Sequence, residues 1–226
     1  MTEPSRTEPS EPGAVAQRTP AEAWREMVEG NERFIAGTPN HPRQDVERRA
    51  LLADGQAPDV ALFGCSDSRL AAEIIFDKGL GDLFVVRNAG QIISESAIAS
   101  LEYAIALLGV PLIVVLAHDA CGAVRAAIDQ VQPDPDPLPP HIASHIGPIA
   151  PAVRRVRASG GTTDPVSVGL EHLRGTVRGL VEQSELISDG IAAGTLAIVG
   201  ANYRLAEGRV VPDIVVGDVG ADRAAD

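Results

Sequence analysis

The chain has 226 residues, 45% of them hydrophobic and 22% charged, which is the composition of a globular protein with enough apolar material for one buried core. Its formal net charge of −12 disfavours nucleic acid and anionic membrane surfaces as partners, so we expect a small-molecule substrate. The N-terminus has no basic stretch leading into an apolar run, and no window approaches the ~20 apolar residues of a membrane span, so we expect a soluble, cytoplasmic protein without a membrane partner.

The N-terminal part of the chain is rich in Pro, Glu, Ser and Thr. It has too little apolar surface to offset the entropy of ordering, so we expect residues 1–18 to be a disordered tail and residues 19–226 to form a single domain. A helix is predicted to begin at Thr19, because a Thr cap, a Pro at the first helical position and a Glu three residues after the cap form a typical helix start. Gly37 can end this helix. Its apolar face is predicted to contain Trp24, Met27, Val28 and Phe34.

Four short apolar runs are predicted to be strands of one sheet: Val60–Gly64, Leu83–Val86, Leu112–Ala117 and Leu196–Val199. None of them alternates between apolar and polar residues, which is typical of strands that are covered on both faces. Helical patterns lie between them, notably Ala97–Leu108 and Ala120–Gln130. Strands that alternate with helices favour a parallel sheet.

The C-terminal part of the chain indicates a hairpin. The apolar stretches Ala197–Leu205 and Arg209–Val216 flank a short turn ending in Gly208, which predicts an antiparallel edge strand. The Pro-rich stretch 132–140 breaks any regular element and is expected to be a surface loop. The predicted fold class is therefore α/β, with a mostly parallel central sheet of four strands plus an antiparallel edge strand, flanked by helices.

Two of the predicted strands end in residues that can bind a metal ion. Cys65 follows the first strand, and Asp67 and Arg69 come just after it. His118 follows the third strand, and Cys121 opens the next helix, where unpaired N–H groups favour a thiolate. The carboxyl ends of parallel strands meet at one edge of a sheet, so these side chains are expected to converge there. Two thiolates and one imidazole are typical of zinc, and Asp67 could fill the fourth position or pair with Arg69 and leave it open.

The motif CSDSR at 65–69, followed by HDACG at 118–122, resembles the zinc signature of the β-carbonic anhydrases. The stretches FVVRNAG at 84–90 and SLEYA at 100–104 also resemble that family, and the resemblance extends from about Ala21 to Val216. It implies that residues 19–226 are a catalytic domain. It also implies one Zn²⁺ per chain with Cys65, His118 and Cys121 as ligands, Asp67 and Arg69 as the catalytic pair, and Asp67 as a conditional fourth ligand.

The same resemblance implies a substrate pocket formed by Gln56, Phe84, Tyr103 and Gly122. Gln56 could donate a hydrogen bond to a substrate oxygen, while Phe84 and Tyr103 form an apolar wall. Without the resemblance, Gln56 would be interpreted as a turn residue and the two aromatic residues as core. The family further implies a homodimer or homotetramer, whose first helix reaches across to a neighbour and whose pockets lie at the interface.

The implied reaction is the reversible hydration of CO2 to bicarbonate and a proton by attack of zinc-bound hydroxide. Two thiolates cancel the charge of the zinc ion, so the bound water is expected to be a weaker acid than water on three neutral histidines. Asp67 competes with hydroxide for the fourth position, and the cation of Arg69 can draw the carboxylate away. This predicts a switch between closed and open sites.

Alternative functions differ from this one in the motifs that they require. An alcohol-dehydrogenase-like enzyme would need G-x-G-x-x-G after a strand, and a zinc deaminase would need H-x-E and P-C-x-x-C, but the sequence has none of these. A hydrolase of a CO2 analogue such as carbonyl sulfide would use the same zinc hydroxide. A structural or regulatory zinc protein would close the site with Asp67, although such a site has no need of Arg69.

The remaining histidines are weaker candidates for chemistry. His141 and His145 are four residues apart and could share a helix face, so a second metal site is an alternative there. No carboxylate accompanies them in the usual metalloprotease pattern. His41 and His172 are predicted to be surface residues.

Overall fold

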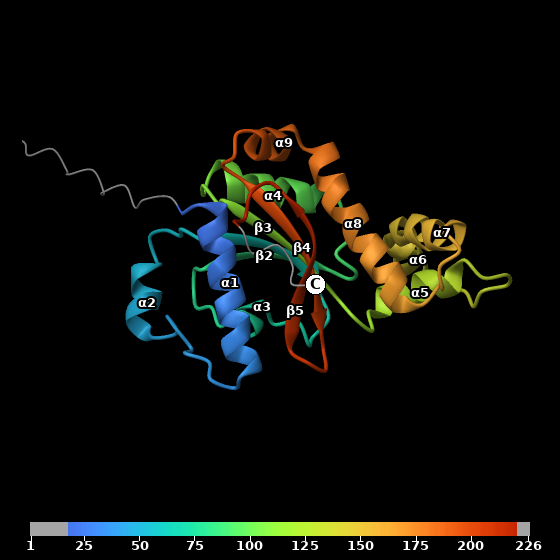
Figure 1. Ribbon diagram of the computed structural model, residues 1–226, viewed down its shortest axis with the longest axis horizontal. Helices are drawn as coiled ribbons and strands as arrows, with labels where there is room; N and C mark the ends of the chain where they lie inside the picture. Colours follow the sequence, from blue (N-terminus) through green and yellow to red (C-terminus); the bar gives the residue numbers. More distant parts are fainter. Residues whose placement is uncertain (1–17, 221–226) are drawn as a thin grey trace, which may run out of the picture.

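A five-stranded sheet lies at the centre of the fold (Figure 1). The computed structural model describes residues 18–220, so the predicted tail lies outside the described residues except for Arg18. The strands stand in the order β2-β1-β3-β4-β5. Their bounds are β1 Val60–Cys65, β2 Leu83–Asn88, β3 Leu112–His118, β4 Ala197–Arg204 and β5 Arg209–Val216. The first four are parallel and β5 is antiparallel to β4, which confirms the predicted sheet and its edge strand.

Strands β1 and β3 are buried at every position, because each has a neighbour on both sides and helices on both faces. Continuous apolar runs are required at such positions. In the register of the sheet, Cys65 pairs with Asn88 of β2, and Gly64 pairs with Leu116, two residues before His118. The carboxyl ends of β1, β2 and β3 therefore meet at one edge.

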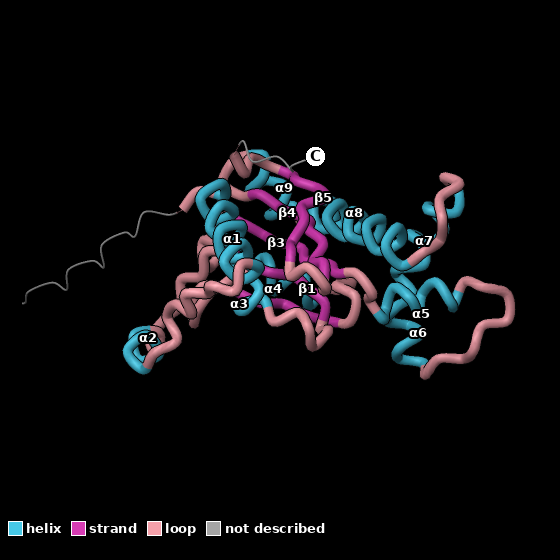
Figure 2. Tube along the Cα trace, turned by 60° about the horizontal axis from the view of Figure 1, so that its bottom comes forward, coloured by secondary structure: helices cyan, strands magenta, loops and turns pink. Residues whose placement is uncertain are grey.

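Helices cover both faces of the sheet (Figures 1 and 2). Val60 and Leu62 point into a core that includes residues of α1 and α3, while Ala61 and Phe63 point into a second core with α4, α8 and α9. This alternation follows from the two-residue repeat of a strand. The bounds of these helices are α1 Pro20–Ile35, α3 Ala72–Ile75, α4 Glu95–Ala106, α8 Pro165–Gln183 and α9 Glu185–Ala192.

A group of short helices lies beyond the sheet, and α8 runs from the sheet to this group (Figure 1). It consists of α5 Gly122–Gln130, α6 Pro140–Ile146, the 3-10 helix η1 Gly147–Ile149 and α7 Ala150–Ala158, while α2 Val46–Leu51 lies on the other side of α1. The Pro-rich segment between α5 and α6 is an exposed loop, as predicted, although Pro140 already starts α6. No helix within residues 18–220 combines the length and the hydropathy needed to cross a membrane.

Two predicted helices begin at residues other than those expected. Helix α4 starts at Glu95 because the Ser94 hydroxyl accepts a hydrogen bond from the Ala97 N–H and caps the first turn. Helix α5 starts at Gly122 and not at Ala120, because Ala120 has a φ of 50°, in the left-handed region that a helix cannot contain. The expectation that Cys121 opens this helix is confirmed, since Cys121 is its N-cap residue.

Helix α1 packs on the sheet of its own chain. Its start has the predicted capping box between Thr19 and Glu22. Its own residues Trp24 and Met27 are buried on the face that meets the sheet. The buried Asn31 side chain bonds the carbonyls of Ile75 and Gly208, at 3.1 and 2.8 Å, and so ties the helix to α3 and to the β4–β5 hairpin. These contacts hold α1 on its own chain, and the additional contact of this helix with a neighbouring chain stays a prediction.

The two ends of the described chain lie close together. A Cβ atom placed on Gly220 would lie 3.5 Å from the Cβ of Ala21, the second residue of α1. Arg18 forms ion pairs with Glu26 and, at 3.0 Å, with Asp59 just before β1. Arg18, the last residue of the predicted tail, therefore has ion pairs with the folded part of the chain.

Candidate metal centre

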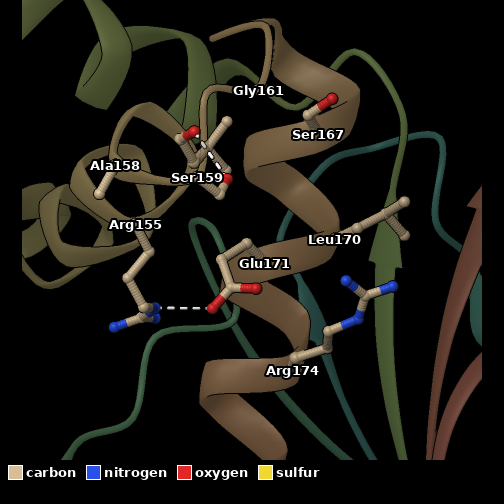
Figure 3. Close-up of a pocket in the computed structure, with 9 residues that line it drawn as sticks. Arg155, Ala158, Ser159, Gly161, Ser167, Leu170, Glu171 and Arg174 are labelled. Atoms are coloured by element: carbon tan, nitrogen blue, oxygen red, sulfur yellow. Dashed lines mark hydrogen bonds and ion pairs between the residues drawn. The ribbon is translucent and has the colours of Figure 1, made fainter.

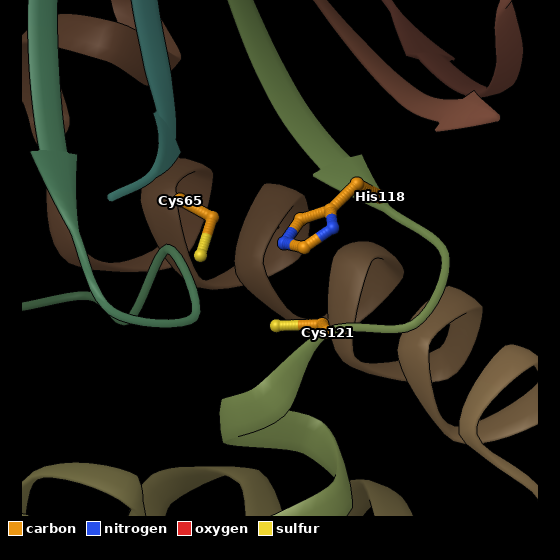
Figure 4. Close-up of side chains that lie close together, drawn as sticks. All are labelled: Cys65, His118 and Cys121. Carbon is orange, nitrogen blue, oxygen red and sulfur yellow. The ribbon is translucent and has the colours of Figure 1, made fainter. Parts of the chain in front are cut away.

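Cys65, His118 and Cys121 point toward one another at the carboxyl edge of the sheet (Figure 4). Cys65 is the last residue of β1, His118 is the last residue of β3, and Cys121 caps α5. All three are buried, and their ligand atoms lie within 4.8 Å of one another. In the part of the chain that the structure describes, this is the one group of three or more metal-binding side chains. The predicted convergence of these three residues is therefore present.

The His118 ring is oriented to offer one nitrogen to this cluster. Its Nδ1 lies 2.8 Å from the carbonyl oxygen of Asp119, which can only accept, so Nδ1 carries the proton. Nε2 is then left with a free lone pair, and it is buried without a hydrogen-bond partner. A buried acceptor without a partner costs folding free energy, and a metal ion bound to Nε2 would remove that cost. The residues present therefore fit a metal ion.

The two cysteines behave as one coupled pair. The Cys121 thiol donates a hydrogen bond to Cys65, and together with the Gly90 N–H it lowers the pKa of Cys65 to about 4, although burial opposes this. The pKa of Cys121 is raised, because it faces Cys65 and is itself buried. The helix N–H groups of Ala123 and Val124 lower the pKa of Cys121 as predicted, but the neighbouring sulfur outweighs them. A dication that binds both sulfurs would take the place of the remaining proton.

Asp67 is held by Arg69 and not by the cluster. The Arg69 Nε and Nη2 donate to the two carboxylate oxygens at 2.8 and 2.7 Å, and the backbone N–H of Arg69 donates at 3.0 Å. This pairing holds the pKa of Asp67 well below its usual range. Asp67 Oδ2 lies 3.9 Å from His118 Nε2 of the cluster. The carboxylate is thus ionised, paired with Arg69 and adjacent to the ligand atoms.

Arg87 fixes the turn that carries these residues, a role that the sequence analysis did not assign. Its Nε donates to the carbonyl of Cys65 at 2.9 Å, and its Nη2 donates to the carbonyl of Asp67 at 2.7 Å. Arg87 lies on β2, next to β1, one residue before the position opposite Cys65. The only sequence signal for it is its place in the FVVRNAG motif.

The predicted pocket residues fall into two places. Gly122 is the first residue of α5, beside Cys121, and a Cβ placed on it would meet nothing within 4 Å. Phe84 stacks on Tyr103 with ring centroids 6.1 Å apart, but it lies four positions before the metal end of β2, roughly 13 Å along the strand. Gln56 is exposed and precedes the other end of β1. One chain therefore brings Gly122 to the cluster and leaves Gln56, Phe84 and Tyr103 away from it.

The other histidines differ from the expectations in one case. His172 was predicted to be a surface residue, but it is buried in α8, and its Nε2 lies 2.8 Å from the carbonyl oxygen of Gly90. Its place on the inner side of an amphipathic helix explains the burial. His41 is exposed, as predicted. His145 uses its Nε2 to bond the Ala89 carbonyl at 2.9 Å, which argues against a second metal site with His141.

A separate cleft of about 680 Å³ lies between α7 and α8 (Figure 3). The charged residues that line it are already paired: Arg155 bonds Glu171 at 2.6 Å within the cleft, and Arg174 bonds Asp213 of β5, outside the lining, at 2.7 Å. None of the three cluster residues lines it. The volume of this cleft therefore says nothing about the chemistry of the cluster.

Comparisons with known proteins agree on one family. Residues 60–210 match a family model described as "Carbonic anhydrase". "Carbonic anhydrase 2" of Mycobacterium tuberculosis H37Rv is 47% identical over 204 residues, which cover 90% of this chain and 97% of that protein. "Carbonic anhydrase" of Mycolicibacterium smegmatis is 45% identical over 202 residues, which cover 89% and 97%.

Two solved structures have the same fold. The β-carbonic anhydrase CcaA is 27% identical with a TM-score of 0.62, covering 84% of this chain and 87% of its own. One of two tetrameric β-carbonic anhydrases from Sordaria macrospora, at 23% identity and a TM-score of 0.66, covers 84% and 96% and supports the fold alone.

A parallel α/β sheet whose strand ends bring two thiols and an imidazole to one buried point defines a protein with a metal-binding α/β fold. The family model spans all three of these residues. The chain belongs to the β class of the carbonic anhydrase family of enzymes. These matches favour neither a carbonyl sulfide hydrolase nor a zinc protein without turnover.

Proposed function

We propose that this enzyme interconverts CO2 and bicarbonate with one zinc ion held by Cys65, His118 and Cys121, in a single catalytic domain formed by residues 19–226. One observation supports the metal site above all. The Nε2 of His118 is buried and has no partner, and it lies with two sulfur atoms inside a 4.8 Å cluster. Thiolate and imidazole together suit zinc better than they suit magnesium or calcium, which prefer oxygen ligands.

Zinc bound here would supply a nucleophile near neutral pH by lowering the pKa of the water that it holds. The chain's own residues fix the ligands around it. The Asp119 carbonyl holds the proton of His118 on Nδ1, so Nε2 always faces the cluster. The Gly90 N–H donates to Cys65 Sγ at 3.3 Å and stabilises its negative charge. Arg87 holds the backbone on both sides of the Cys65–Asp67 turn.

Asp67 and Arg69 control access to the fourth position in this proposal. While Arg69 holds both carboxylate oxygens, Asp67 leaves that position to water and substrate. The ionised carboxylate can accept a hydrogen bond from a protonated oxygen nearby and so orient it. The open space beside Gly122 supports the proposal that a small substrate fits next to Cys121. The same carboxylate would close the site if it left Arg69.

A second copy of the chain is proposed to complete the substrate pocket. Phe84 and Tyr103 form an aromatic pair whose Tyr103 is 46% exposed, far along the sheet from the chain's own metal cluster. They lie by the edge strand β2, which has no further strand beside it within residues 18–220 and is only half-buried. An unpaired, apolar strand edge is a surface that proteins normally cover. We propose a homodimer or homotetramer in which Gln56, Phe84 and Tyr103 serve the metal of a neighbouring chain.

The test couples metal analysis to CO2 hydration. Purified full-length protein is expected to contain about one zinc ion per chain and to accelerate CO2 hydration, and a chelator is expected to remove metal and activity together. Added zinc should restore both. Protein that hydrates CO2 at full rate after complete removal of metal would overturn the zinc proposal. Zinc-replete protein without hydration would overturn the proposed reaction.

A further inference from the structure

The loop after β2 has a strained backbone beside the metal cluster. Gly90 has a φ of 85° and the next residue, Gln91, has a φ of 41°, so two successive residues adopt left-handed conformations. Gln91 is also almost fully buried, which is unusual for a residue with this backbone. A loop of this kind persists only when its surroundings hold it in place.

Side chains from two helices bond the carbonyls of this loop one after another. His145 of α6 lies 2.9 Å from the Ala89 oxygen, through its Nε2. His172 of α8 bonds the Gly90 oxygen at 2.8 Å, and Thr176 approaches the Gln91 oxygen at 3.5 Å. Because carbonyl oxygens only accept, both histidines donate an Nε2 proton here. Two successive peptide groups of the loop are thus fixed by histidines, while the Thr176 hydroxyl lies closer to the His172 carbonyl, at 3.1 Å.

One of these peptide groups connects His145 directly to Cys65. The Ala89 carbonyl and the Gly90 N–H are the two ends of a single trans peptide, since the described chain has no cis peptide bond. At one end His145 donates to the oxygen, and at the other the N–H donates to Cys65 Sγ at 3.3 Å. Hydrogen bonds arranged in such a chain polarise and strengthen one another.

We propose that His145 is a positioning residue for the metal centre, which acts on Cys65 through the Ala89–Gly90 peptide. His172 fixes the next peptide and keeps the loop from rotating away. The proposal rests on the proposed function, because Cys65 must be a metal ligand for its charge to matter. A hydrogen bond to a ligand sulfur holds the sulfur in place and stabilises the negative charge with which it binds a metal ion, and loss of such outer contacts typically lowers metal affinity 10- to 100-fold.

The proposal predicts how three variants of α6 should differ. His145→Ala removes the donor, so the zinc affinity should fall about tenfold, at the lower end of the usual range because the contact is indirect. His145→Gln keeps an N–H donor of similar reach and should restore much of the loss. His141→Ala is the matched control, because His141 is an exposed histidine one turn earlier on the same helix. It should bind zinc as wild type does.

Two measurements distinguish positioning from a general loss of structure. Zinc affinity is measured by competition with a chromophoric chelator, and the sulfur-to-cobalt charge-transfer band is recorded for the cobalt-substituted proteins. In His145→Ala this band should move to lower energy, because the Gly90 N–H then donates a weaker hydrogen bond to Cys65 and leaves the thiolate easier to oxidise. The melting temperature of each metal-free variant is compared with wild type as a folding check.

Two results would overturn the proposal. The first is a His145→Ala protein with the zinc affinity and the cobalt band of wild type. The second is an equal loss of affinity in His141→Ala, which would assign the effect to α6 as a whole. Neither result depends on turnover. A failure of the proposed reaction would appear separately, as zinc-replete wild type that does not hydrate CO2.

Discussion

The orientation of His118 determines what the metal cluster can bind. Its protonated Nδ1 is occupied by a backbone carbonyl, so the only unsatisfied atom of the ring faces the two sulfurs. A histidine that served packing alone would have both nitrogens satisfied or exposed to water. The geometry of His118 thus indicates a metal ligand, as the sequence motif does, and this conclusion rests on the hydrogen bonds alone.

Removal of any one ligand should prevent zinc binding. In Cys65→Ala, His118→Ala or Cys121→Ala two strong donors remain, too few for a stable site, so we expect well under one zinc per chain and no hydration activity. Metal content by atomic emission and initial hydration rates check this. The control is His41→Asn, an exposed histidine whose left-handed backbone Asn tolerates. A Cys65→Ala protein that kept full zinc and turnover would show that the cluster is not the metal site.

Loss of Arg69 should separate metal binding from activity. Arg69→Ala frees Asp67 to move onto the fourth position, so zinc should stay bound while kcat/KM falls by about 100-fold or more, the lower end of the range for a lost general acid–base group. The double variant Asp67→Asn/Arg69→Ala has no carboxylate to close the site. Equal activity of Arg69→Ala and wild type would contradict the switch.

The activity of wild type should rise from neutral to alkaline pH. Two thiolates cancel the zinc charge, so the water that the metal activates is a weaker acid than water on three imidazoles. The pKa of Asp67 is depressed, so this carboxylate stays ionised throughout and is not the group that titrates. Its contribution to stability is present above the ordinary carboxyl pKa and is lost only as the pH falls through its depressed value. A flat profile of zinc-replete enzyme between pH 7 and about 9 would contradict this expectation.

At the scale of elements, the sheet could be predicted well and the helices less well. Each predicted strand lies within or next to an observed one, because buried parallel strands need apolar runs that few other elements need. The sequence pattern of α5 extends back to Ala120, because it carries no sign of the φ of 50° that excludes this residue from the helix. The helices between Pro140 and Gln183 were not assigned bounds, since their apolar residues face an irregular group of short helices.

The metal ligands could be predicted from their motif and from strand ends, whereas the residues that hold them could not. Arg87, His145 and His172 act through backbone carbonyls. Such contacts depend on where a loop passes in space, and the side chain alone does not indicate them. The sequence leaves the partner of Asp67 open between zinc and Arg69, and in the structure the carboxylate pairs with Arg69.

The contact between α1 and α3 depends on a glycine. A Cβ on Gly30 would lie 1.9 Å from the Phe76 carbonyl oxygen, so Gly30→Ala must push the helix away, at a cost of roughly 1–3 kcal/mol in unfolding free energy. Gly169 of α8 is the matched control, because its Cβ would meet nothing within 4 Å. Gly169→Ala should raise stability by about 0.5–1 kcal/mol through helix propensity. Denaturant unfolding measures both, and a Gly30→Ala protein as stable as wild type would refute the close contact.

At the scale of the whole molecule, the separation of the pocket residues from the metal allows a test in mixed oligomers. A Gln56→Ala chain keeps its metal cluster, and a Cys65→Ala chain keeps its Gln56. If each pocket draws on two chains, a mixed dimer contains one intact site and one site with both defects. Random pairing of equal amounts should restore about a quarter of the wild-type activity.

Co-expression of the two chains, followed by hydration assays on the purified mixture, makes this measurement. The control pairs Cys65→Ala with His118→Ala, which damage the same cluster in each chain and should give no recovery. Absence of recovery in the first mixture, in oligomers shown to contain both chains, would mean that Gln56 serves the metal of its own chain.

The nearness of Gly220 to Ala21 has a consequence for chain connectivity. Both ends of the described fold lie by the first turn of α1, and Arg18 reaches Asp59 at the opposite end of β1 from Cys65. In a chain trimmed to residues 18–220, a short flexible linker could therefore join the two ends, and new ends could be opened in the exposed loop between α5 and α6. Such a circular permutant should fold, bind zinc and hydrate CO2 at a rate close to that of wild type. In this permutant β4 and β5 would be synthesised before β1, β2 and β3. The sheet would then form its observed strand order from a different order of synthesis.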